Sequence, residues 1–118
     1  SLAVVDLNGF KNINDSLGHQ EGDGALNMIA GVLREGVRKS DLVYRIGGDE
    51  FAILMPYADK IGAGILLERL KGQIGEYKGV KLGFSYGVAA RGEIVTKEEM
   101  FNAADKAMYG SKQKSKNG

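Results

Sequence analysis

Two acidic residues, Asp49 and Glu50, directly follow the glycine pair Gly47-Gly48 near the middle of the chain. The flanking runs 41–46 and 51–55 are rich in apolar and β-branched residues and predict two strands. Because glycine accepts the positive φ that tight turns require, the pair predicts a hairpin between them. A turn without side chains also lets a ligand approach the backbone closely. The stretch is therefore either a carboxylate-bearing ligand site or an ordinary solvated turn, and geometry alone favours neither.

A third carboxylate, Asp6, follows the apolar run 2–5, which predicts a strand buried on both faces. Residue types alone favour Asp6 as a cap for the next helix over a ligand at the strand edge. If this strand lies beside the central hairpin, however, Asp6 and Asp49 converge. Two or three carboxylates, with backbone carbonyls and phosphate oxygens, are typical ligands of Mg²⁺. A paired-ion site of this kind suits displacement at phosphorus.

Apolar residues at helical spacing predict three helices, whose buried faces run through 10–17, 26–37 and 63–77. Gly18 is expected to end the first helix. Asp23 stands at the start of the second, where an acidic N-cap is the ordinary interpretation. These helices must pack on the strands that carry the carboxylates.

The third helix is expected to present Glu68 and Arg69 on a solvated polar side. Alternating apolar residues over 80–90 predict the last strand. A capping box of Thr96 and Glu99 then opens a last helix. The order β-α-α-β-β-α-β-α predicts an α+β fold, a sandwich of a mainly antiparallel sheet with helices packed on it.

Length and composition restrict the range of functions. The 118 residues predict one domain, 1–118, that can bury a core. A net charge of +1 gives no support for a nucleic-acid binder, and the absence of cysteine excludes disulfides and thiolate metal sites. No apolar run approaches the ~20 residues of a membrane span, so no membrane contact is expected.

Several motifs share their order with a known family. The stretch 47–51 spells Gly-Gly-Asp-Glu-Phe, and here the chain resembles the GGDEF family, the diguanylate cyclases. Segments 6–15 and 18–23 are similar to the family's first and second metal and nucleotide segments. Segments 85–88 and 104–109 match its C-terminal signatures. The occurrence of all these motifs in the family's order is stronger evidence for the resemblance than the Gly-Gly-Asp-Glu-Phe motif alone.

The resemblance implies a fold of the nucleotide-cyclase or polymerase-palm type and a reaction on GTP. The 3′-hydroxyl of each of two GTP molecules attacks the α-phosphate of the other, which gives cyclic di-GMP and two pyrophosphates. One domain binds one GTP, so catalysis requires a two-fold symmetric homodimer. A cytoplasmic location and an upstream sensory or regulatory domain are also implied.

The resemblance further implies roles for individual residues. Metal binding is assigned to Asp6, the Leu7 carbonyl, Asp49 and Glu50, with Mg²⁺ as the ion and Mn²⁺ as an alternative. Asp49 and Glu50 are the catalytic residues, and Asp49 has two candidate roles, metal ligand and base for the attacking hydroxyl. The implied substrate-binding residues are Phe10, Lys11, Asn14, Asp23, Gly47, Gly48, Lys112 and Lys116.

Among these residues, Asn14 and Asp23 match the family's guanine contacts. A carboxylate can accept from guanine N1–H and the exocyclic amine, which adenine does not offer. Lys112 matches a phosphate-contacting lysine. Lys116 stands where the family usually has arginine, so the charge is kept but the bidentate fork is lost, and weaker triphosphate affinity is expected.

Arg38 and Asp41 resemble the family's inhibitory Arg-x-x-Asp site, five residues before Gly47. An arginine can bridge guanine O6 and N7, so product binding is implied here. The alternative is an arginine that ends a helix and an aspartate that opens a strand.

The chain also departs from the family pattern. The family's first helix, with its Asp-x-Leu-Thr segment, is lacking, so we expect an N-terminally truncated domain. The alternative function is therefore a weak or inactive module that binds GTP or cyclic di-GMP and signals through a partner. A purely structural domain is the third interpretation, and it requires every matched motif to be coincidental.

Overall fold

The structure is a computed structural model and describes residues 1–90. Its elements are β1 (Leu2–Asn8), α1 (Phe10–Leu17), α2 (His19–Gly36), β2 (Leu42–Arg45), β3 (Glu50–Leu54), α3 (Lys60–Gln73), β4 (Glu76–Tyr77), β5 (Val80–Lys81) and β6 (Gly83–Ala89). The predicted order β-α-α-β-β-α is confirmed, and the α+β class with it. The helix expected after Thr96 lies outside the described residues.

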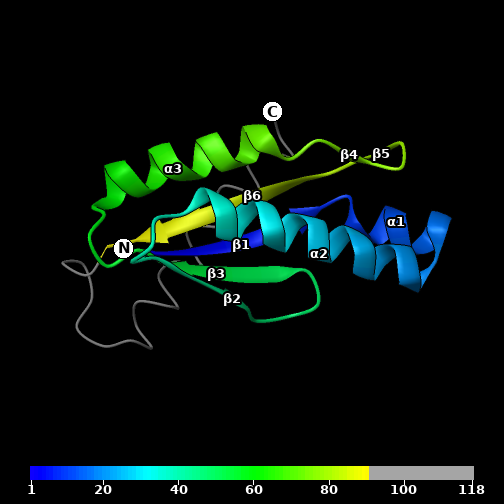
Figure 1. The fold of residues 1–118 in the computed structure, drawn as a ribbon, viewed down its shortest axis with the longest axis horizontal. Coiled ribbons are helices and arrows are strands. Elements are labelled where there is room, and N and C mark those ends of the chain that lie inside the picture. Colours follow the sequence, from blue (N-terminus) through cyan, green and yellow to red (C-terminus); the bar gives the residue numbers. More distant parts are fainter. Residues whose placement is uncertain (91–118) are drawn as a thin grey trace.

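The main sheet has four strands in the order β2-β3-β1-β6, and all neighbours are antiparallel (Figure 1). β1 is central because its first residues are apolar on both faces, and Ala3, Val4 and Val5 are fully buried. The strand extends two residues past Asp6, which was expected at its end. The neighbour relation that the metal prediction required is confirmed, since β1 pairs directly with β3.

The helices pack on one face of this sheet. In Figure 1, α2 lies in front of the strands and α3 runs alongside β6. Alternate residues of β1, Ala3, Val5 and Leu7, contribute to the core between sheet and helices. Burying a large apolar side chain contributes about 1.5–3 kcal/mol. This packing, rather than helix propensity, holds α3, which contains three glycines that each cost about 1 kcal/mol relative to alanine.

Gly18 ends α1, as predicted, at a φ of 92°, and its N–H donates to the Asn14 carbonyl at 3.1 Å. The same glycine is the N-cap of α2, which therefore begins at His19. Asp23 lies in the second turn of α2 and not at its start. The interpretation of Asp23 as an N-cap is wrong, because one glycine both ends one helix and begins the next.

The third helix is shorter than its apolar pattern predicts. α3 ends at Gln73, and Tyr77, expected on its buried face, lies in β4. β4 and β5 form a separate hairpin whose turn residues, Lys78 and Gly79, have φ values of 47° and 85°. Positive φ at both central residues matches the twist of a two-residue hairpin. The strand expected over 80–90 is accordingly divided into β5 and β6.

The small hairpin packs on the first turns of α2. Tyr77 donates its hydroxyl to the Glu21 carboxylate at 2.9 Å, and Lys78 Nζ lies 2.7 Å from the same carboxylate. The ion pair with Lys78, followed by the Tyr77 hydrogen bond, lowers the pKa of Glu21. Gly24 permits this contact, because a Cβ there would overlap the Tyr77 hydroxyl. The hairpin thus braces the turns of α2 that carry Asp23.

Candidate functional site

Asp6 and Glu50 are direct partners in the ladder between β1 and β3. On the other side of β1, Asp6 pairs with Ser85 of β6. Residues directly opposite in an antiparallel pair share a face, with Cβ atoms about 4.5–5.5 Å apart. Since alternate residues of β1 enter the core under the helices, Asp6 and Glu50 lie on the opposite face of the sheet. The backbone register therefore places two carboxylates side by side.

The turn between β2 and β3 continues this ladder by one residue. The Leu7 N–H donates to the Asp49 carbonyl at 2.9 Å. Because the N–H and C=O of one strand residue point to the same neighbour, the Leu7 carbonyl is directed toward this turn. The Glu50 carbonyl closes the turn by accepting from the N–H groups of Ile46 and Gly47, at 2.9 and 3.3 Å. The predicted hairpin is confirmed, with Gly47, Gly48 and Asp49 exposed.

Arg45, which was not among the predicted site residues, holds the glycine turn. Its Nε donates to the Gly47 carbonyl at 3.1 Å and its Nη2 to the Gly48 carbonyl at 3.0 Å. One planar guanidinium thus contacts both glycines that precede Asp49. Sequence reasoning assigned Arg45 only to a strand, although an arginine two residues before a glycine pair is within reach of the turn.

The oxygen groups at this site fit Mg²⁺ in kind. Asp6, Asp49 and Glu50 offer carboxylates, and the Leu7 carbonyl faces the same turn. Carboxylate and carbonyl oxygens are the hard donors that Mg²⁺ prefers. Within residues 1–90, no three His, Cys, Asp or Glu side chains form a group that could hold a metal ion by themselves. Magnesium is commonly held by one or two carboxylates plus substrate phosphates and water. This donor set would suit a Mg²⁺ ion that also binds a phosphate ligand.

The two residues predicted to contact guanine come from neighbouring helices. Asn14 is half-buried in α1, and Asp23 is exposed on α2. Contact between the helices passes through Gly22, where a Cβ would overlap the Asn14 Oδ1. The structure thus brings Asn14 next to the residue that precedes Asp23.

The remaining predicted substrate residues are partly described. Phe10 is the first residue of α1 and packs against the core, while Lys11 beside it is exposed. Lys112 and Lys116 lie outside the described residues.

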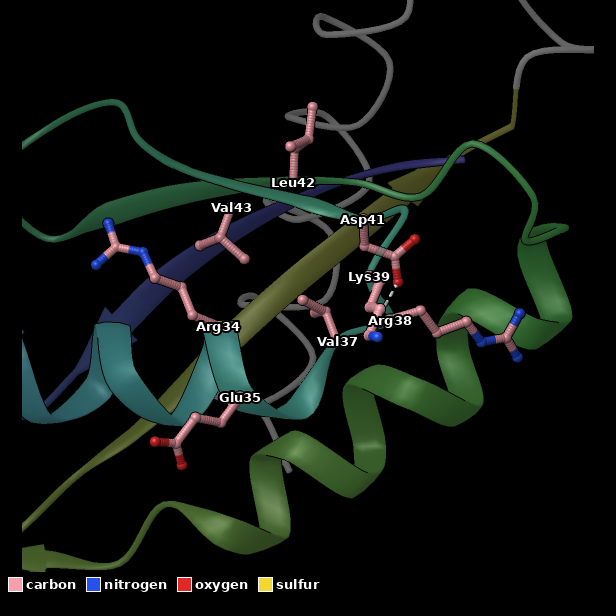
Figure 2. A pocket seen from close by; sticks show the side chains of 8 residues that line it. All are labelled: Arg34, Glu35, Val37, Arg38, Lys39, Asp41, Leu42 and Val43. Carbon is pink, nitrogen blue, oxygen red and sulfur yellow. Dashed lines mark hydrogen bonds between the residues drawn. The ribbon is translucent and has the colours of Figure 1, made fainter.

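Arg38 and Asp41 form a closed turn between α2 and β2. The Asp41 carboxylate accepts from the Arg38 N–H at 2.9 Å, and the Asp41 N–H donates to the Arg38 carbonyl at 2.9 Å. A cavity of about 500 Å³ opens here (Figure 2). Its walls are Arg34, Glu35, Val37, Arg38, Lys39, Asp41, Leu42 and Val43. Figure 2 shows Arg34 and Arg38 pointing away from each other, Arg38 toward α3.

Arg69 of α3 belongs to the same region, which sequence reasoning missed. It lines a smaller hollow together with Arg38 and Asp41. Its Nη2 donates to the Gly36 carbonyl, at the end of α2, at 2.7 Å. The side of α3 that was predicted to be only solvated therefore contacts the end of α2 through Arg69. Its other residue, Glu68, accepts from the Tyr86 hydroxyl at 2.6 Å, and burial followed by this bond raises the pKa of Tyr86 to about 12.

Fold and site together define an antiparallel α+β domain that presents carboxylates beside an exposed glycine turn. The family profile described as "Diguanylate cyclase, GGDEF domain" matches residues 1–118, and the chain belongs to this family.

Curated relatives carry the corresponding names. The chain is 40% identical over 117 residues to diguanylate cyclase DgcP of Pseudomonas aeruginosa, covering 94% of this chain and 17% of the relative. It is 33% identical over 120 residues to diguanylate cyclase DgcS of Shewanella oneidensis, covering 99% of this chain and 40% of the relative. The chain therefore spans less than half the length of either protein.

Solved structures of GGDEF domains have the same fold. The GGDEF domain of PA1120 (YfiN or TpbB) from Pseudomonas aeruginosa aligns with a TM-score of 0.86 at 34% identity, over 96% of this chain and 75% of that one. The GGDEF domain of DgcB from Caulobacter crescentus, in complex with c-di-GMP, aligns with a TM-score of 0.85 at 28% identity, over 95% and 71%. Over residues 1–90, none of the helices is both long and apolar enough for a membrane span.

Proposed function

We propose that this domain is a diguanylate cyclase that condenses two GTP molecules into cyclic di-GMP. The observation that carries the proposal is the pairing of Asp6 with Glu50 beside the exposed turn of Gly47, Gly48 and Asp49. It supports the proposal because Gly47 and Gly48 carry no side chains of their own that would keep a triphosphate from the turn, while Arg45 holds their carbonyls. The names of the curated relatives support the same activity.

In the proposed reaction, two phosphorus–oxygen bonds form, two break, and two hydroxyl protons are released. Each 3′-hydroxyl oxygen forms a bond to the α-phosphorus of the other GTP, and each α–β phosphoanhydride bond breaks to release pyrophosphate. The hydroxyl protons pass to Asp49 or to water. Magnesium, when bound, would stabilise the attacking and leaving oxygens of this displacement. Asp6, Glu50, Asp49 and the Leu7 carbonyl are the groups that would hold it.

The remaining parts of the proposal concern substrate, assembly and feedback. Asn14 and Asp23 bind guanine, and two domains face each other so that each presents one GTP to the other. Lys112 and Lys116 contact the phosphates. Cyclic di-GMP binds at Arg38 and Asp41 as an inhibitor, and Arg69 is added to this site because it lines the same hollow. We also propose a cytoplasmic domain that works within a longer protein.

Incubation of the purified chain with GTP and Mg²⁺, with the product identified by mass, tests the activity. We expect cyclic di-GMP and pyrophosphate, and a specific activity that rises with protein concentration in the dilute range because two domains must meet. Removal of Mg²⁺ by a chelator should stop the reaction. GTP binding without any turnover would instead favour the alternative, a module that binds the nucleotide and signals through a partner.

The base preference gives a second test. We expect Asp23→Ser to reduce discrimination between GTP and ATP by roughly tenfold or more, because hydrogen bonds to a charged group contribute about 1.5–3 kcal/mol. The measurement is a competition assay with both nucleotides. Asn27→Ser, an exposed position one turn further along α2, is the matched control. Unchanged discrimination in Asp23→Ser would remove Asp23 from the guanine site.

A further inference from the structure

Gly22 is a buried glycine in α2 at its contact with α1. A Cβ built on Gly22 would overlap the Asn14 Oδ1 and would lie 3.0 Å from the Asn14 Cγ. The same operation at Gly31, further along α2, meets no atom within 4 Å. The requirement for glycine at position 22 therefore comes from the Asn14 side chain and not from the helix itself.

The Asn14 amide depends on this packing for its position. Within residues 1–90, the Asn14 side chain forms no hydrogen bond, although its backbone carbonyl accepts from the Gly18 N–H. Its amide lies against the bare backbone of Gly22, where a Cβ would overlap the Asn14 Oδ1. The next residue, Asp23, is exposed on the same helix turn.

We propose that Gly22 is a positioning residue for guanine recognition, because its missing side chain lets the Asn14 amide lie against α2 beside Asp23. This inference rests on the proposed function, in which Asn14 and Asp23 bind the base. Any side chain at position 22 pushes the Asn14 amide away from α2 and separates the two guanine contacts. Gly22 thus acts on the base through Asn14 and touches no substrate atom.

An Asn14→Ala background separates the positioning role of Gly22 from a role in helix packing alone. In an Asn14→Ala background the two atoms that a Cβ at position 22 would crowd, Oδ1 and Cγ, are absent. The next atom, Phe10 Cε2, is 3.6 Å away, which is ordinary van der Waals contact. Alanine at position 22 therefore fits once Asn14 has been shortened, and it should raise the melting temperature because alanine favours a helix over glycine.

The experiment compares the wild-type chain, Gly22→Ala, Asn14→Ala and the double variant. The probe is a GTP analogue with a methylene between the α- and β-phosphorus, which cannot react, in the presence of Mg²⁺. We expect Gly22→Ala and Asn14→Ala each to weaken binding by about tenfold, the scale of one lost hydrogen bond to the base. The double variant should bind no more weakly than Asn14→Ala alone, since both changes remove the same contact. Gly31→Ala should bind as the wild type does.

Each other outcome has a definite meaning. If Asn14→Ala weakens binding but Gly22→Ala does not, this inference is overturned while the proposed base site stands. Equal losses from Gly22→Ala in both backgrounds would also overturn it, because Gly22 would then act independently of Asn14. If Gly22→Ala fails to fold, Asn14→Ala must restore the fold, and failure to do so would overturn the inference too. Wild-type binding by Asn14→Ala would reject the base site itself and this inference with it.

Discussion

Replacing Asp49 with asparagine should abolish product formation, with a loss of roughly a thousandfold or more in turnover. The reason is that removing one group that stabilises transition-state charge costs about 10²–10³ in rate, and Asp49 is assigned both to the metal and to the hydroxyl proton. The measurement is cyclic di-GMP formed per minute at saturating GTP and Mg²⁺.

The structure makes Asp49→Asn a clean change. The Asp49 side chain is exposed, and the contact that joins this residue to β1 is its backbone carbonyl, which asparagine keeps. Stability should therefore change by no more than about 0.5 kcal/mol, as is usual at surface positions. Glu76→Gln, at an exposed acid of β4 outside the assigned segments, is the control and should retain activity. Near-wild-type turnover in Asp49→Asn would show that the acidic turn is not the reaction centre.

The two candidate roles of Asp49 respond differently to magnesium. If Asp49 acts mainly as a metal ligand, raising the Mg²⁺ concentration should restore part of the activity of the asparagine variant. If it acts mainly as the base, added Mg²⁺ should leave the loss unchanged. A titration of rate against Mg²⁺ for both proteins decides between them.

Arg38→Ala should weaken inhibition by added cyclic di-GMP by about tenfold or more and leave the initial rate nearly unchanged. An arginine that bridges guanine O6 and N7 contributes about 1–3 kcal/mol of recognition. Arg38 and the glycine turn lie at opposite ends of β2, whose four residues span about 13 Å. We therefore expect product bound at Arg38 to act on catalysis as a coupling between distinct sites, by holding two active sites apart.

Arg38 is a better position for this test than Asp41. The Asp41 carboxylate closes the turn through the Arg38 N–H, so its removal would disturb the backbone, whereas the exposed Arg38 side chain can be shortened without that cost. Arg34→Ala is the matched control, since it removes the same charge from the same cavity but points away from Arg38 (Figure 2). Arg69→Ala should behave like Arg38→Ala. Identical inhibition curves for all four proteins would contradict the proposed feedback site.

The strands of the site could be predicted because their signals are local. The apolar run 2–5 is compatible only with a buried position, and a glycine pair between two β-prone runs favours a hairpin. The position of the first strand beside the hairpin entered only as a condition, and the family resemblance implied that Asp6, Asp49 and Glu50 bind metal. The structure makes Glu50 the direct ladder partner of Asp6, a detail that depends on register across strands more than 40 residues apart.

Other features could not be predicted because they depend on contacts between distant segments. The spacing of Tyr77 suits a helix face, and only the positive φ of Lys78 and Gly79 places it in a hairpin that reaches Glu21. Arg69 resembles any exposed arginine until α3 packs beside the end of α2. The need for glycine at position 22 could not be predicted either, because it depends on how closely Asn14 of α1 approaches α2.

The central position of β1 has a consequence for how this domain is made. β1 is synthesised well before its partner β6, and the register joins Asn8 to Gly83 near the opposite end of the described residues. Contacts between such distant residues carry a high loop-closure cost and slow folding. The sheet cannot be completed until β6 has been synthesised, which at roughly 5–20 residues per second leaves β1 without one neighbour for several seconds. During that interval the helical pair α1–α2 and the β2–β3 hairpin can form locally, so the elements that carry the proposed site residues form before the strand that completes the sheet.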